Sequence, residues 1–421
     1  MKNTQIEWIG NIPDNWDVKP ISTCFKERNE KVSDYEWEPL SVTKQGIVKQ
    51  LETAAKSDAH DARKKVCKND FVINSRSDRK QSCGVSLYNG SVSLINIVLE
   101  NRKLNPKFVN YLLKNYGFAE EFYRYGSGIV ADLWSTNYQK MKKIMIPIPP
   151  KDKQEKIADF LDKKTLEIDN IIEKTKENIE DYKKYKQSVI TEGVTKGLNT
   201  NVEMKESGID WIGKIPYKWK MARIKNIAQI FGRIGFKGYT QNDFVSKGEG
   251  AITLSPSNFN DLKMNYETCS YLSWSKYEES PEIQIKNGDI LFVKTGSSYG
   301  KVCMVELLPM EATINPQMIV FKNIMINNLF LTYLLYSNYI QYQTEISVTG
   351  GTIPTMSQEK INNFRIVFPS EEEQISICNY ISAKIKNIDK IIEKENQIIK
   401  ELEEYKKSLI YEYVTGKKEV I

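Results

Sequence analysis

The sequence is poor in histidine and in long apolar runs. It has 421 residues but only one histidine, His60, which excludes a histidine-based triad, a multi-histidine metal site and an H-E-x-x-H zinc helix. Its six cysteines lie far apart without a C-x2-C pair, a pattern typical of reduced thiols. No apolar run approaches the roughly 18 residues of a transmembrane helix, and the amino terminus lacks a signal-peptide core. We therefore expect a cytoplasmic protein with no membrane segment and no bound metal.

The net charge of +6 is unevenly distributed along the chain. It amounts to +6 over 1–150, −1 over 151–204, +3 over 205–370 and −2 over 371–421. A mild basic excess on two long, alternate segments is compatible with nucleic-acid binding and by itself favours it only slightly.

The chain repeats itself. Residues 6–16 (IEWIGNIPDNW) match 209–219 (IDWIGKIPYKW) at an offset of 203. At an offset of 220, seventeen of the 43 residues from 154 to 196 are identical to their counterparts without a gap. This period is far longer than that of a solenoid. The sequence therefore indicates a tandem duplication of one half, each half being a globular part followed by a charged, periodic part.

The periodic parts show heptad spacing, which predicts long helices with one apolar seam. Capping-box patterns precede both, at 149–155 and at 370–373. Because chain order sends the second helix back along the first, we expect an antiparallel pair whose two similar globular ends are related by a pseudo-two-fold axis. The expected interface residues are Ile157, Leu161, Ile168, Ile171, Tyr182, Tyr185, Val189, Ile377, Ile381, Ile388, Ile391, Ile398, Leu402, Tyr405 and Leu409.

The globular parts combine short β-branched runs, such as 70–74 and 289–293, with short apolar helical segments at 108–116 and 330–337. Neither part has regular βαβ alternation, so the expected fold class is α+β. The expected domain boundaries are 1–150 for the first globular part, 151–196 for the first helix, 197–208 for a linker, 209–369 for the second globular part, and 370–421 for the second helix and its tail.

Catalytic motifs are not evident. The segment 295–302 (TGSSYGKV) lacks the first glycine and the Ser/Thr of a phosphate-binding loop. Asn315-Pro-Gln-Met lacks the aromatic residue of an amino-methyltransferase motif. Acidic-x-Lys pairs such as Glu203 and Lys205 occur outside the strand context of a nuclease.

Polar and basic residues recur at matching places in both globular parts. Such side chains contact phosphates and base edges, although ordinary surface loops have a similar composition. The candidate DNA-contacting residues of the first part are Arg76, Arg79, Lys80, Gln81, Ser127, Trp134, Ser135, Asn137 and Lys140. Those of the second part are Lys294, Ser297, Ser298, Tyr299, Lys301, Thr352, Thr355, Ser357 and Lys360.

The combination resembles the specificity subunit of type I DNA restriction and modification enzymes. The resemblance covers essentially the whole chain. It rests on the Trp-Ile-Gly-x-Ile-Pro opening of each half (8–13 and 211–216), on the strand-to-helix junctions with Gln154 and Gln374, and on the Ile-Asp-x-Ile-Ile-Glu-Lys cores at 168–174 and 388–394.

The resemblance implies that each globular part is a target recognition domain for one half of a split, asymmetric double-stranded DNA sequence, with the helices setting the spacer. It also implies that the helices dock two modification (methyltransferase) subunits, which methylate adenine using S-adenosylmethionine. Restriction/translocase subunits would add ATP- and Mg-dependent cleavage, and this chain itself would bind no cofactor and catalyse no reaction. Two alternatives stay open at this point, namely a coiled-coil adapter that does not bind DNA and a self-contained DNA-modifying enzyme.

Overall fold

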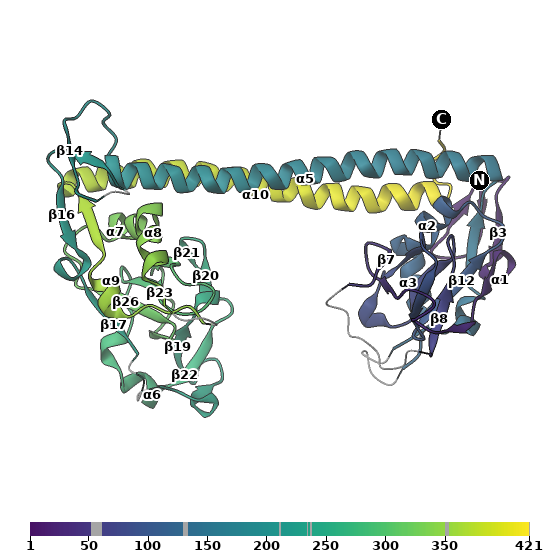
Figure 1. Ribbon diagram of the computed structural model, residues 1–421, viewed down its shortest axis with the longest axis horizontal. Coiled ribbons are helices and arrows are strands. Elements are labelled where there is room, and N and C mark those ends of the chain that lie inside the picture. Colours follow the sequence, from purple (N-terminus) through teal and green to yellow (C-terminus); the bar gives the residue numbers. More distant parts are fainter. Residues whose placement is uncertain are drawn as a thin grey trace. The chain divides into compact units, whose positions relative to one another are not determined.

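The computed structural model describes residues 1–51, 61–128, 134–209, 212–233, 235, 238–349 and 353–420. The chain divides into two compact units. The first unit comprises Met1–Lys176 and Asn396–Ile421, and the second comprises Glu177–Glu395. Both units mix helices and strands (Figure 1), as expected for an α+β protein.

Strands of the first unit pair antiparallel throughout the part that the structure describes. The main sheet has the order β10-β9-β12-β4, a second sheet has the order β11-β8-β5, and three strand pairs join β1 with β2, β3 with β13 and β6 with β7. In chain order the strands are β1 (Lys2–Asn3), β2 (Asn11–Ile12), β3 (Asp17–Pro20), β4 (Phe25–Glu27), β5 (Lys31–Val32), β6 (Leu40–Val42), β7 (Ile47–Lys49), β8 (Arg63–Val66), β9 (Phe71–Asn74), β10 (Cys83–Val85), β11 (Gly90–Ser93), β12 (Asn96–Asn101) and β13 (Met145–Ile148).

The described residues of the first globular part also form the short α-helices α1 (Ile21–Cys24), α2 (Pro106–Lys114), α3 (Tyr116–Arg124) and α4 (Tyr138–Met141). Asn105 caps α2 by accepting hydrogen bonds from the backbone N–H groups of Lys107 and Phe108 at 2.9 and 3.2 Å. Phe108 is fully buried in one core with Phe71 of β9, so α2 covers the main sheet through its apolar face.

The second unit repeats this plan with one addition. Its sheet β17-β26-β23-β24 corresponds to the main sheet of the first unit, and a second sheet has the order β18-β22-β19-β25, in which β19 and β25 run parallel. Strand pairs join β14 with β15, β16 with β27 and β20 with β21. The strands are β14 (Met204–Glu206), β15 (Lys214–Pro216), β16 (Lys220–Arg223), β17 (Gln229–Gly232), β18 (Phe244–Val245), β19 (Gly250–Leu254), β20 (Phe259–Asn260), β21 (Lys263–Met264), β22 (Ser270–Ser273), β23 (Ile290–Val293), β24 (Val302–Met304), β25 (Ala312–Ile314), β26 (Met318–Lys322) and β27 (Arg365–Phe368).

The short helices of the second unit are α6 (Trp274–Glu278), α7 (Asn328–Tyr336), α8 (Asn338–Ser347) and α9 (Gln358–Asn362). Asn327 caps α7 through the N–H of Phe330 at 3.0 Å, as Asn105 caps α2. Because α7 and α8 repeat the position of α2 and α3 behind the sheet, the duplication extends into the globular parts.

Two long helices, α5 (Lys151–Lys196) and α10 (Glu371–Val414), each contribute to both units. Within each unit a length of α5 lies beside a length of α10, as Figure 1 shows. In the first unit Ile157, Leu161 and Leu409 join the core of the globular part, and in the second Ile190 and Ile377 do so. The helices are therefore packed onto both globular parts.

Candidate nucleic-acid interface and helix pair

The buried seam of the helix pair follows strict heptad spacing. On α5 it contains buried or half-buried side chains at alternating steps of four and three, and the residues 220 positions later on α10 repeat the pattern. The positions on α5 are Leu161, Thr165, Ile168, Ile172, Thr175, Ile179, Tyr182, Lys186 and Val189. Those on α10 are Ile381, Ile385, Ile388, Ile392, Glu395, Ile399, Leu402, Lys406 and Leu409.

Five residues expected in the seam lie outside it. Of the others, Ile157, Leu161, Ile168, Val189, Ile377, Ile381, Ile388 and Leu409 are buried, and Tyr182 and Leu402 are half-buried. The exposed fractions are 48% for Ile171, 52% for Tyr185, 37% for Ile391, 42% for Ile398 and 53% for Tyr405. The expectation was wrong for these five because each has a neighbour, one position later, that occupies the heptad site. In two cases that neighbour is a lysine, which a search for apolar residues passes over.

These two seam lysines form equivalent ion pairs. In the second unit, Lys186 Nζ lies 2.7 Å from Asp389 Oδ1. In the first unit, Lys406 Nζ lies 2.6 Å from Asp169 Oδ2. Both lysines and both aspartates are related by the 220-residue offset, so the two pairs are copies of one antiparallel contact. A lysine in an apolar seam favours the register in which it meets its carboxylate.

Lys186 has a second carboxylate partner, and within the part of the chain that the structure describes Lys406 has only one. Lys186 Nζ lies 2.5 Å from Asp261 Oδ2, in the turn between β20 and β21. The hydroxyl of Tyr336 in α7 donates to the other oxygen of Asp261 at 2.8 Å. Burial lowers the pKa of Lys186, but hydrogen bonds from its amine to Asp261 and Asp389 outweigh that effect and leave the pKa raised. This polar cluster fixes the globular part of the second unit to both helices.

A glutamine clamps each globular part to the start of its long helix. Gln154 Oε1 accepts from the N–H of Asn105 at 2.9 Å, and its Nε2 donates to the carbonyl of Pro149 at 2.9 Å. Gln374 makes the same two bonds in the second unit, with Asn327 at 2.8 Å and Pro369 at 3.0 Å. Both glutamines are buried, so their bonds link the cap of a domain helix to the first turn of a long helix.

The candidate loops of the first unit meet at a three-segment junction. Arg76 follows β9 and pairs with Ser135, which also pairs with Ser127. Lys140 Nζ donates to the Ser127 hydroxyl at 2.9 Å, which adds the short helix α4 to the junction. Arg76 and Ser127 are exposed there. The structure therefore brings together loop residues that are separated by up to 64 positions in the sequence.

The second unit has the same junction with different side chains. Thr295 follows β23 and pairs with Thr355, which also pairs with Thr349. The hydroxyls of Thr295 and Thr355 are 2.8 Å apart. Lys360 Nζ donates to the carbonyl of Ser347 at 2.8 Å, the counterpart of the Lys140 contact. One backbone frame thus presents two different sets of polar groups.

Several candidates have structural roles in this frame. Trp134 Nε1 donates to the carbonyl of Tyr123 at 2.7 Å, and the ring leaves no space for a Cβ at Gly126. Tyr299 packs partly buried against the core of the second unit. Asn137 and Ser357 cap α4 and α9 through the N–H groups of Lys140 and Lys360, respectively.

The remaining candidate DNA-contacting residues differ in how exposed and how unconstrained their side chains are. Lys80 is engaged by Glu120 at 2.5 Å, and Gln81 has a φ of 64° at the end of a tight turn. Arg79 has a side chain 69% exposed, with Asp78 at 3.6 Å. Lys294 and Ser298 are half-exposed, and Ser297 and Lys301 are exposed beside the junction. Thr352 and Trp211 lie outside the described residues.

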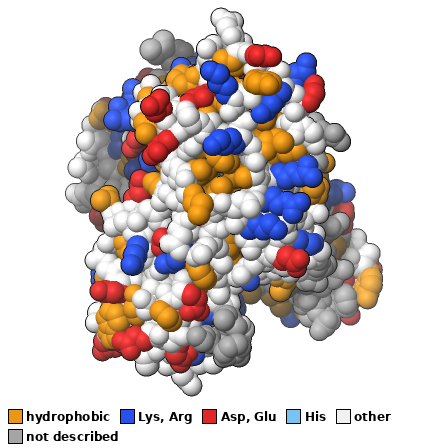
Figure 2. Space-filling view, turned by 90° about the vertical axis from the view of Figure 1, so that its left-hand side faces the viewer, with side chains coloured by type: hydrophobic (Ala, Val, Ile, Leu, Met, Phe, Trp, Pro, Cys, Tyr) orange, Lys and Arg blue, Asp and Glu red, His pale blue; other side chains and the backbone are white. Residues whose placement is uncertain are grey.

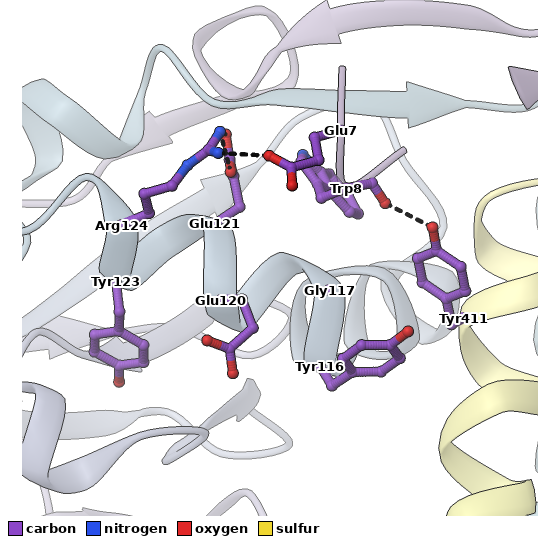
Figure 3. A pocket seen from close by; sticks show the side chains of 9 residues that line it. All are labelled: Glu7, Trp8, Tyr116, Gly117, Glu120, Glu121, Tyr123, Arg124 and Tyr411. Carbon is purple, nitrogen blue, oxygen red and sulfur yellow. Dashed lines mark hydrogen bonds and ion pairs between the residues drawn. The ribbon is translucent and has the colours of Figure 1, made fainter. Parts of the chain in front are cut away.

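A hollow of about 580 Å³ lies on the first unit where α3 approaches the end of α10 (Figure 3). Arg124 bridges Glu7 and Glu121 on its rim, at 2.9 and 2.7 Å. The hydroxyl of Tyr411 donates to the carbonyl of Trp8 at 2.9 Å. Arg124 and Tyr411 thus hold the segment of Glu7 and Trp8 against α3 and α10, while the buried Nε1 of Trp8 has no hydrogen-bond partner among the described residues.

Comparison with known proteins places the chain in a family. The family model described as the type I restriction modification DNA specificity domain matches residues 14–181 and 216–404, one match for each half. The chain belongs to this family. Its globular parts are DNA-binding target recognition domains, and specificity subunits are the non-catalytic members of type I restriction-modification systems.

Two relatives of this specificity subunit come from Methanocaldococcus jannaschii. The type I restriction enzyme MjaVIII specificity subunit is 26% identical over 335 residues, covering 78% of this chain and 73% of the relative. The putative type I restriction enzyme MjaX specificity subunit is 23% identical over 438 residues, covering 97% and 95%.

Two solved structures share the fold. A chain from a study of complex assembly and conformational transition of the type I R-M system has a TM-score of 0.70 at 14% identity, covering 96% of this chain and 98% of that one. The HsdS subunit from Thermoanaerobacter tengcongensis has a TM-score of 0.52 at 14% identity, covering 97% and 98%. In the described part of the specificity subunit, no helix is long and apolar enough to cross a membrane.

Proposed function

We propose that the two target recognition domains each read one half of a bipartite, asymmetric DNA sequence, and that the helix pair sets the spacer between the halves. The observation that carries this proposal is the duplicated junction. Arg76, Ser127 and Ser135 in the first unit correspond to Thr295, Thr349 and Thr355 in the second. A shared frame with different side chains supports reading two different half-sites.

The helix pair also has features of a docking surface. Ile171 and Tyr185 on α5 are exposed, and so are their identical counterparts Ile391 and Tyr405 on α10. Exposed apolar side chains at equivalent positions of a duplicated surface suit two copies of one partner. We infer that the partners are two methyltransferase subunits, which bring S-adenosylmethionine, and that restriction/translocase subunits add ATP- and Mg-dependent cleavage.

A domain exchange tests the DNA-reading proposal. Replacing residues 6–149 with the equivalent domain of a relative should change one half of the methylated sequence and leave the other half and the spacer as they were. Sequencing of methylated adenines in cells that carry each version would show this. A change in both halves, or in neither, would rule out modular reading.

Single substitutions separate the two kinds of DNA contact. If the side chain reads a base, Arg79→Ala or Lys294→Ala should weaken binding to the target DNA by about 1–3 kcal/mol and relax the base preference at one position of the target sequence. If it contacts a phosphate, the affinity for all sequences should fall alike. Competition binding with a set of single-base variants of the target distinguishes these results.

Substitutions on the exposed helix faces test the docking proposal. Ile171→Asp with Tyr185→Asp should weaken the binding of methyltransferase subunits to one side of the helix pair and leave the chain folded. Leu166→Asp is a matched control, because Leu166 is 61% exposed and its counterpart 220 positions later is Lys386. Equal binding by all three proteins, measured by sedimentation, would refute docking at this surface.

A further inference from the structure

The second unit carries an exposed strip of basic side chains beside its candidate DNA-contacting loop. Arg223 of β16 and Arg365 of β27 are direct partners across the two antiparallel strands. Lys225 follows β16 and is exposed, as are the two arginines, whereas Lys220 at the start of β16 belongs to the opposite face of the strand. Figure 2 shows Lys and Arg side chains gathered on a face of this unit. Like charges directly opposite each other on a strand pair are unfavourable unless an anion joins them.

No carboxylate neutralises this strip within the described residues. Arg223 Nη1 donates to Asn363 Oδ1 at 3.2 Å, and Lys360 Nζ donates to the carbonyl of Ser347 at 2.8 Å. These are bonds to neutral oxygens, so the positive charge of both groups persists. Across the part of the chain that the structure describes, Lys225 and Arg365 likewise form no ion pair.

A polar hollow connects the strip to the candidate loop. It has a volume of about 510 Å³, and its lining includes Ser357, Lys360, Asn363 and Arg365. Ser357 and Lys360 belong to the candidate DNA-contacting set, and Arg365 belongs to the strip. Among the described residues that line it, Glu359 is the one carboxylate and Ile346 and Phe364 are apolar, and the others bear hydroxyl, amide or cationic groups. Such a surface suits an anion that accepts several hydrogen bonds.

Apart from Lys360, whose counterpart is Lys140, the basic residues of the strip have no basic counterpart in the first unit. Arg223 and Arg365 correspond to Pro20 and Met145, which pair in the same register between β3 and β13. Lys225 corresponds to Ser22 at the 203-residue offset. The paired arginines and Lys225 are therefore a property of the second unit, whereas Lys360 belongs to the shared frame.

We propose that this strip, Arg223, Lys225, Lys360 and Arg365, binds backbone phosphates of the DNA duplex that flanks the second half-site. This inference rests on the proposed function. Phosphates fit better than an acidic protein because seven of the nine residues that line the hollow are polar or charged, whereas an anchoring side chain of a protein partner needs an apolar pocket. The strip concentrates positive charge where the second globular segment has a net charge of only +3.

Salt dependence of DNA binding by the assembled complex tests the proposal. Each phosphate contact contributes about 0.9 to the slope of log K against log salt concentration, so Arg223→Gln with Arg365→Gln should lower the slope by about 1.8. Affinity near 0.1 M salt should fall by about five- to tenfold for each arginine. Glu359→Gln should tighten binding, and the methylated sequence should stay the same in all variants.

Two controls accompany these variants. Lys214→Gln with Lys286→Gln removes the same charge from exposed sites elsewhere in the second unit and should leave the slope unchanged. Arg223→Lys with Arg365→Lys keeps the charge and should keep the slope. The single variants Arg223→Gln and Arg365→Gln, each expected to lower the slope by about 0.9, provide the measurement if the double glutamine variant does not fold.

The possible outcomes separate the strip from the proposed function. An unchanged salt-dependence slope in the glutamine variant, or a lowered slope in the lysine variant, refutes phosphate binding by the strip and leaves the proposed function intact. A relaxed base at one target position shows base reading, and lost binding of methyltransferase subunits without DNA shows a protein interface, so either result also overturns it. A wild-type complex that binds no duplex DNA refutes the proposed function.

Discussion

At the scale of single residues, two lysines related by duplication have different environments. The side chain of Lys186 is 5% exposed and faces two aspartates, whereas that of Lys406 is 28% exposed and faces one. Removing a buried cation leaves its carboxylate partners without compensation, whereas an exposed pair is screened by water. The same residue in the same heptad position should therefore contribute unequally to stability.

Lys186→Met should lower the free energy of unfolding by about 3 kcal/mol, because Asp389 and Asp261 lose their shared partner. Lys406→Met, the matched control, should lower it by about 0.5–1 kcal/mol. Urea unfolding followed by circular dichroism measures both. Equal effects would show that burial does not distinguish the two ion pairs.

The contribution of Lys186 should depend on pH in one direction. Its pKa is raised in the folded chain, so the stabilisation is fully present below the ordinary lysine pKa and is lost as the pH rises through the folded value. The difference between wild type and Lys186→Met should therefore be constant from about pH 6 to 9 and shrink only in more alkaline solution. A difference that shrinks between pH 6 and 9 would contradict this assignment.

Burial should protect particular cysteines from alkylation. It raises the pKa of the Cys83 thiol to about 12, and it does the same for Cys303 and Cys378. Because the thiolate is the reactive form, iodoacetamide at pH 8 should leave these three unmodified in the folded protein. Cys67 is partly exposed and serves as the internal control for reagent access. Mass spectrometry of digested protein gives the extent of modification at each site.

At the scale of elements, the sequence predicts that the two long helices exist, but it predicts less well which face of each helix lies in the buried seam. Heptad spacing identifies α5 and α10, and apolar residues at most seam positions indicate the periodicity. Rotation is harder because isoleucine occupies both 171 and 172, and because Lys186 takes a seam site that apolar scoring would give to Tyr185. The charge partner of Lys186 lies 203 residues away, so only the fold shows why a lysine is tolerated there.

Adjacent isoleucines offer a direct test of the rotation. Ile172→Ala should destabilise the chain by about 2–4 kcal/mol, because Ile172 is 6% exposed and its loss leaves a cavity in the seam. Ile171→Ala removes the same atoms from a side chain that is 48% exposed and should cost at most about 0.5 kcal/mol. Thermal unfolding of the two variants would show which isoleucine lies in the seam. A larger destabilisation by Ile171→Ala than by Ile172→Ala would put Ile171 inside it.

The candidate site shows a similar division between what sequence reveals and what it does not. Polar residues after β9 and β23, with glycine-containing segments some 50 residues later, point to one surface in each half. Sequence does not reveal that Trp134 uses its N–H within the frame, or that Tyr299 packs on the core, because both depend on contacts formed by the fold. It also misses the pairing of Arg223 with Arg365, which are 142 positions apart and meet only through strand register.

At the scale of the whole molecule, the first unit is built from both ends of the chain. Lys417 Nζ donates to the carbonyl of Ile9 at 2.6 Å, and Tyr411 donates to that of Trp8. Leu409 and Val414 are buried in the same core as Phe118. The second unit is one continuous segment, Glu177–Glu395. The duplicated halves therefore differ in chain connectivity although they share a fold.

A truncation should reveal this difference. Ending the chain at Glu395 removes Leu409 and Val414 from the first core and exposes the apolar surface they cover. The first unit should lose its cooperative unfolding, and the second should keep it. Hydrogen exchange resolved by peptide would show lost protection in β9 and α2 with preserved protection in β23 and α7. Loss of protection in both units would show that they fold as one.

The joining of chain beginning and chain end in the first unit has a consequence for synthesis. A ribosome makes residues 1–176 first, but the core they enter lacks its last side chains until residues 396–421 have been made. The second unit has all its residues earlier, since its last one is Glu395. The half translated first should therefore be the half that finishes folding last. A message cut short after the codon for Glu395 would then yield a chain with one intact DNA-reading domain and one incomplete one.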